Sequence, residues 1–144
     1  MKVAQHPTMD EIKNAKEKTS YILPPTHSGE QQVLMAYQWF DAQNKIKNEN
    51  KKLFDYKHTI EQWCGSYIST SDVEVAATLH PDVFGSYGSY NISSRLVKPN
   101  DSRLLDIPEA FMHKYYRDLF DESLYPLFED ENNNKTPRTK KSRY

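Results

Sequence analysis

The polar residues between Asn91 and Arg103 have types and a spacing that suit recognition of nucleic acid. An arginine side chain can donate two hydrogen bonds to guanine, and serine and asparagine side chains can contact bases or phosphates. Lysine and arginine can also pair with phosphate oxygens. The segment is locally basic, because Asp101 is its one acidic residue. The candidate nucleic-acid contacts are Asn91, Ser93, Ser94, Arg95, Lys98 and Arg103.

Two predicted helices would position these side chains. Ser71 and Glu74 form a capping-box pattern, which predicts a helix over 72–80 that ends before Pro81. Asn91 is a favourable N-cap and predicts a second, short helix over 91–97. A short β-prone run at 66–70 precedes the first helix, and the proline, asparagine and aspartate at 99–101 predict a turn with a hairpin-like wing around it.

This order of elements over 55–107 resembles winged helix-turn-helix DNA-binding domains. The resemblance implies that 72–80 is the positioning helix and that 91–97 is the recognition helix in the major groove. Lys98 and Arg103 would then flank the wing and reach phosphates. Two features oppose it: the loop over 81–90 is longer than the standard turn, and Asp72 and Glu74 would repel phosphates. The expected function is a DNA-binding accessory or regulatory protein, acting for example in transcription.

The loop over 81–90 supports a different hypothesis. It contains two glycines and three aromatic residues, and tyrosine contributes strongly at protein interfaces. The alternative function is therefore a small protein-binding module or inhibitor, of the kind that phages and plasmids carry. The same rings could instead pack the periphery of the domain itself. The candidate protein contacts are Phe84, Tyr87 and Tyr90.

The whole chain predicts a mostly α-helical fold, winged-helix-like, with a short β-hairpin. We expect a flexible N-terminal arm over 1–25, one globular domain over 26–128 and a disordered charged tail over 129–144. Capping patterns predict helices at 9–18 within the arm, from Ser28 to about Lys47, and at 106–120. Asp55 and Gly65 mark the start and stop of a further helix.

Composition narrows the functional classes. The net charge of the 144 residues is −1, so only local charge could attract a polyanion. The single Cys64 and the lack of a long apolar run predict a cytoplasmic protein without a membrane span. The histidines show no metal-binding spacing. We expect Cys64, beside Trp63, to be a small residue of the core. We therefore expect no enzyme, no metal and no cofactor.

Overall fold

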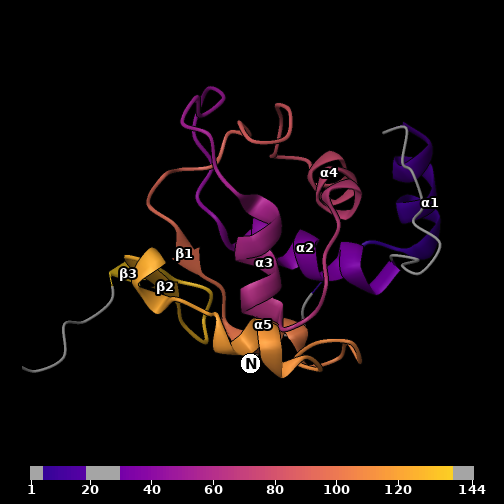
Figure 1. Cartoon of the computed structure of the whole chain (residues 1–144). Helices are drawn as coiled ribbons and strands as arrows, with labels where there is room; N and C mark the ends of the chain where they lie inside the picture. Colours follow the sequence, from indigo (N-terminus) through magenta and orange to yellow (C-terminus); the bar gives the residue numbers. More distant parts are fainter. Residues whose placement is uncertain (1–4, 19–29, 138–144) are drawn as a thin grey trace, which may run out of the picture.

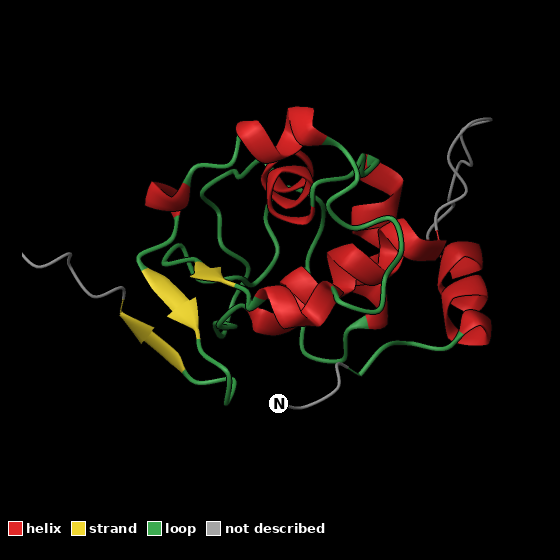
Figure 2. Cartoon of the chain, turned by 90° about the horizontal axis from the view of Figure 1, so that it is seen from below, coloured by secondary structure: helices red, strands yellow, loops and turns green. Residues whose placement is uncertain are grey.

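The computed structural model describes residues 5–18 and 30–137 of the chain. Helices surround a central helix, α2, and a small sheet lies at one end of the molecule (Figures 1 and 2). The fold class is therefore mixed: helices dominate, and three short strands accompany them. The elements in chain order are α1 (Met9–Lys18), α2 (Glu30–Ala42), α3 (Tyr56–Cys64), α4 (Thr70–Leu79), β1 (Val97–Lys98), η1 (Asp101–Leu104), α5 (Lys114–Asp118), η2 (Glu122–Leu124), β2 (Leu127–Glu129) and β3 (Lys135–Pro137).

Helix α2 forms the centre of the core. Residues on most of its circumference are buried, including Val33, Met35, Trp39 and Phe40, as expected for a helix that other elements cover on several sides. Helix α4 packs on α2, and α1 packs on the outside of α4 (Figure 1). Helix α2 ends at Ala42 and not near Lys47 as predicted, and the segment that follows it turns toward β1.

The first helix occupies the predicted residues, Met9–Lys18, and its capping box is confirmed. The backbone N–H of Glu11 donates to the Thr8 hydroxyl, and the Thr8 N–H donates to the Glu11 carboxylate. Ile12 and Ala15 are buried, so this part of the predicted flexible arm packs against the domain. The rest of the arm lies mostly outside the described residues.

Helices α3 and α4 show how local capping signals compete. Helix α3 begins after Asp55 and ends at Gly65 as predicted, and Gly65 has a left-handed φ of 68°. Helix α4 begins two residues earlier than predicted, because Ser69 and Asp72 form the capping box instead of Ser71 and Glu74. The predicted strand at 66–70 is absent: this short connection leads directly into α4.

The sheet lies in a different place from the predicted wing. Strand β1 pairs in parallel with β2, and β2 pairs antiparallel with β3. The hairpin is therefore at 127–137, largely in the stretch that composition assigned to a disordered tail, whereas 99–104 form a turn and the short helix η1. Residues 138–144 lie outside the described part of the chain.

The predicted helix over 106–120 is mostly wrong. Only α5 is helical there, and Phe111 before it has a positive φ of 62°, which interrupts a right-handed helix. Two backbone hydrogen bonds, from Phe111 to Cys64 and from His113 to Gly65, hold this segment against the end of α3. Within the described residues, none of the helices is both long and apolar enough to cross a bilayer.

Candidate functional site

The predicted recognition helix is absent. Residues 91–96 form an irregular, bent connection, and Asn91 is buried. The Asn91 carboxamide accepts a hydrogen bond from the Phe84 N–H (2.8 Å) and donates to the carbonyls of Asp82 (3.0 Å) and Ile46 (3.2 Å). Asn91 therefore connects loop segments by hydrogen bonds and does not cap a helix as predicted. Its side chain is not available to a base.

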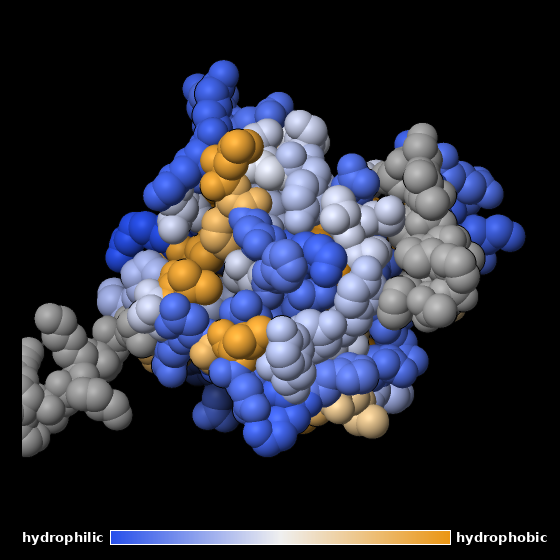
Figure 3. Space-filling model, viewed as in Figure 1, coloured by the Kyte–Doolittle hydropathy of each residue, from blue (hydrophilic) through white to orange (hydrophobic). Residues whose placement is uncertain are grey.

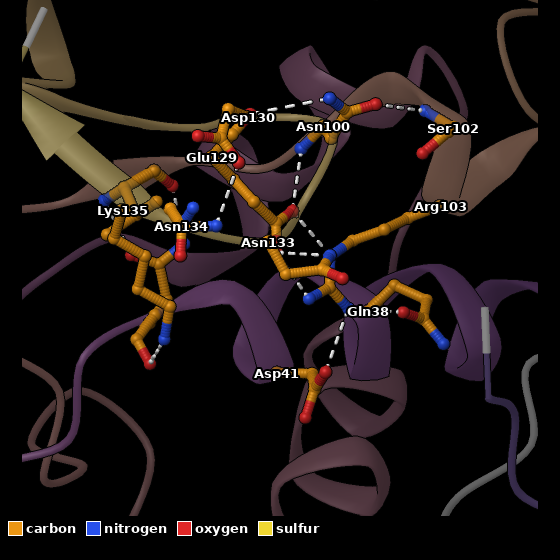
Figure 4. Close-up of polar contacts among 12 residues, drawn as sticks. Gln38, Asp41, Asn100, Ser102, Arg103, Glu129, Asp130, Asn133, Asn134 and Lys135 are labelled. Carbon is orange, nitrogen blue, oxygen red and sulfur yellow. Dashed lines mark hydrogen bonds and ion pairs between the residues drawn. The ribbon is translucent and has the colours of Figure 1, made fainter. Parts of the chain in front are cut away.

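Arg103 lies in a buried ion-pair network and not on a wing (Figure 4). Its Nε and Nη2 atoms donate to the two carboxylate oxygens of Glu129 at 2.7 and 2.6 Å. Its Nη1 atom donates to Gln38 (2.6 Å) and to Asp41 (2.9 Å). Such a bidentate pair uses the fork geometry of the guanidinium fully. Arg103 thus joins η1, α2 and β2, and its charge is compensated internally.

The electrostatics of this network favour ionised carboxylates. Burial alone would raise the pKa of Glu129, but hydrogen bonds from Arg103, Asn100 and Asn133 outweigh it and lower that pKa below its ordinary value. Hydrogen bonds from His80 and Arg103 likewise hold the pKa of Asp41 well below its ordinary range. His80 donates from Nε2 to Asp41 (2.8 Å) because its Nδ1 accepts from the backbone of Asp82.

The remaining predicted nucleic-acid contacts do not form one basic face with Asn91 and Arg103. Ser94 and Arg95 are exposed, whereas Ser93 and Lys98 are half-buried. The Lys98 ammonium lies 3.8 Å from the Asp101 carboxylate, which reduces its attraction for phosphate. The structural premise of the DNA hypothesis is therefore wrong in its helix and in two of its contact residues. DNA binding itself stays a prediction.

The loop over 84–90 instead belongs to a large aromatic cluster. Tyr90 is 3% exposed and packs edge-on against Phe40 and Tyr56. Tyr87 contacts both Tyr56 and Tyr90, and its hydroxyl accepts a hydrogen bond from the backbone of Lys57. Of the three predicted protein contacts, only Phe84 is well exposed, at 48%. Most of this ring surface stabilises the fold.

One hollow beside the cluster is small and mainly apolar, and we call it the apolar pocket. Its volume is about 160 Å³. Lys52 is its one charged lining residue, and Ser93 and Ser94 contribute polar groups at its edge. Asn50 fixes this edge by donating to the Ile92 carbonyl (2.9 Å) and to the Ser94 hydroxyl (2.8 Å). The apolar lining residues are Phe54, Tyr56, Ile92, Leu96 and Leu124.

One exposed leucine lines the apolar pocket, and a second is the chain neighbour of a lining residue. Leu124 lines it while remaining 40% exposed, and Leu53, next to Phe54, is 80% exposed. A Cβ placed on Gly88 would be 3.5 Å from Leu53, so this leucine lies over the loop that carries the tyrosines. Figure 3 shows apolar patches that descend beside the polar surface of α3. Exposed apolar surface of this kind is typical of a contact site.

A second hollow, which we call the aromatic hollow, lies between α4 and the loop over 84–90. Its volume is about 370 Å³. Glu74 is its one charged lining residue, and Thr78 and Ser86 add hydroxyl groups. The rings of Phe84, Tyr87 and Tyr90 complete the lining together with Ala77, Val83 and Gly85.

Neither hollow offers a metal centre. Among the described residues, no group of three or more histidine, cysteine, aspartate or glutamate side chains is placed to hold a metal ion. Cys64 is fully buried, and burial raises the pKa of its thiol to about 12. A thiol with so high a pKa stays protonated at neutral pH and is a poor nucleophile.

Sequence reasoning missed several of these residues. Leu124 begins an aromatic and apolar run with Tyr125 and Leu127, and nothing in that pattern separates the exposed leucine from its buried neighbours. Glu129 gave no signal, because it begins an acidic run that composition alone assigns to solvent. Asp41 lies at the end of an apolar helix, where pairing with a residue 62 positions away cannot be read from spacing.

Comparison of the chain with protein-family models, with curated proteins and with solved structures gives no match. The winged-helix resemblance therefore rests on the sequence pattern alone.

Proposed function

We propose that the protein is a binding module for another protein and that the apolar pocket receives one apolar side chain of its partner. The observation that carries this proposal is the combination of a formed apolar pocket with a partly exposed leucine, Leu124, in its wall. Interfaces of this kind concentrate their binding energy in a few anchors that fill well-packed pockets.

The volume of the pocket defines the anchor. An engineered protein cavity of about 150 Å³ accommodates benzene, so a pocket of about 160 Å³ suits one aromatic ring or one leucine side chain. Leu124 would cover the backbone beside the anchor and exclude water from it. Lys52 at the edge favours an acidic residue next to the anchor in the partner.

Peptide selection tests this function without knowledge of the natural partner. Random peptides displayed on phage are selected on the immobilised protein, and the enriched sequences are synthesised and titrated. We expect a shared leucine or aromatic residue, with an affinity that falls at least about tenfold in Leu124→Lys. Leu105→Lys is the matched control, because Leu105 is 74% exposed but does not line the pocket. Peptides without an apolar residue, or equal losses in both variants, would refute the proposal.

The DNA hypothesis has a separate test. With Asn91 and Arg103 buried, sequence-specific binding would depend on the exposed Arg95, and a mobility-shift assay of duplex DNA at low salt measures it. A specific shift that Arg95→Ala abolishes would support that hypothesis, and the absence of any shift would refute it.

A further inference from the structure

We propose that the aromatic hollow binds an alkylammonium cation. The site is distinct from the apolar pocket and goes beyond the proposed function. It combines one carboxylate, Glu74, with the rings of Phe84 and Tyr87, and the buried Tyr90 supports them from behind. Ammonium groups bind against the faces of such rings, since the ring quadrupole places negative charge there.

Glu74 is well placed to supply the negative charge. It lies on α4 at i, i+3 and i+4 spacing with Ala77 and Thr78, so these three residues share the helix face that lines the hollow. Glu74 is half-exposed, and within the described part of the chain its carboxylate has neither a hydrogen-bond nor an ion-pair partner. A cation in the hollow would give this carboxylate a counter-charge.

The rings form adjacent walls. Phe84 exposes about half of its surface and Tyr87 is half-buried, so both rings can contact a ligand, whereas the buried Tyr90 packs edge-on behind Tyr87 at 77° with centroids 6.4 Å apart. The lining includes no basic residue that would already occupy the rings. A metal ion is a poor fit, because calcium and magnesium require several oxygen ligands and the hollow has one carboxylate.

The loop holds these walls in place before any ligand arrives. Phe84 and Asn91 are joined by two hydrogen bonds, from the Phe84 N–H to the Asn91 side chain and from the Asn91 N–H to the Phe84 carbonyl. Gly85 has a φ of 115°, and a Cβ there would meet the Ser89 carbonyl oxygen at 3.0 Å. A further hydrogen bond from the Ser89 N–H to the Ser86 carbonyl closes the turn. Such preorganisation lowers the entropy cost of binding.

An NMR titration with tetramethylammonium tests the site. We expect saturable shifts of the Gly85 and Gly88 amides, and an affinity that falls about two- to fivefold in Glu74→Gln and in Phe84→Leu. Glu17→Gln is the matched control, since it removes the same charge from an exposed position on α1. Neopentyl alcohol, a neutral molecule of similar shape, should not shift these amides.

Two results would overturn the proposal: no shift up to about 50 mM tetramethylammonium, far above a millimolar dissociation constant, or equal shifts with neopentyl alcohol. A comparison of the affinities of n-butylammonium and of a short peptide with one central lysine shows whether the natural cation is a free amine or a lysine side chain. Binding of the peptide at least about tenfold more tightly identifies a protein side chain, and equal binding identifies a free amine. Leu124→Lys should leave this titration unchanged, which separates it from the test of the apolar pocket.

Discussion

Substitution of Glu129 by glutamine should destabilise the protein strongly. The Glu129 carboxylate is fully buried and accepts hydrogen bonds from the Asn100 N–H, from two nitrogens of Arg103 and from the Asn133 side chain. Glutamine keeps the shape but removes the charge, and its amide group directs a donor toward other donors. The loss of one partner from a buried ion pair costs about 3–5 kcal/mol. We expect about 3 kcal/mol here, because Asp41 still accepts from Arg103.

Urea denaturation followed by far-UV circular dichroism measures this loss. A total stability of about 5–15 kcal/mol is usual for a domain, so the variant should lose a large share of it. The melting temperature should fall by about 10 °C. Glu131→Gln is the matched control: Glu131 is exposed two residues further along, and its substitution should change stability by less than about 0.5 kcal/mol.

A double-mutant cycle with Arg103→Met shows whether the loss belongs to the pair. We expect a coupling energy of about 1–3 kcal/mol between the two positions. A loss below about 1 kcal/mol in Glu129→Gln, with an unchanged denaturant slope, would refute our reasoning that this network stabilises the junction of η1, α2 and β2. Equal losses in Glu129→Gln and Glu131→Gln would refute it as well.

Three further predictions concern pH, backbone and reactivity. Because the pKa values of Asp41 and Glu129 are lowered in the folded protein, the unfolded state takes up more protons in acid. The urea midpoint should therefore fall as the pH drops below about 4.5, and it should fall less in Glu129→Gln. Gly65→Ala should cost about 1–3 kcal/mol in the same assay, because φ is 68° and the new Cβ would meet the Phe111 backbone at 2.8 Å. Burial and, to a smaller extent, repulsion by Lys135 lower the pKa of Lys45 to about 8. The ¹³C NMR signal of Lys45 after reductive methylation should therefore titrate near pH 8, and its pKa should rise in Lys135→Gln.

The local signals of the sequence located two helices but failed at 106–120, where the positive φ of Phe111 interrupts the predicted helix. Thr8 with Glu11 located the first helix, and Asp55 with Gly65 located both ends of α3. Where two signals overlapped, the choice failed, as in α4, where Ser69 and not Ser71 caps the helix. Asn91 shows the same limit: asparagine suits an N-cap and a loop brace equally, and only contacts with distant segments separate the two roles.

The two hollows were partly accessible to sequence reasoning. Phe84, Tyr87 and Tyr90 were singled out as one surface, and they do lie together, but Tyr90 is buried and mostly packs the core. Glu74 was read as a helix-capping residue, yet it lines the aromatic hollow. Ser93 and Ser94 were read as base contacts, yet they border the apolar pocket.

The sequence by itself determined the start of α1 and both ends of α3, because these depend on residues three or four positions apart. Tertiary structure alone decided the fate of the charged residues. Arg103 and Glu129 are 26 residues apart, and each is an ordinary surface residue by composition until the fold buries them together. The same long-range pairing placed a strand where composition predicted disorder and left Leu124 in the wall of a pocket. Burial depends on which distant segments meet, and neighbouring residues do not encode that choice.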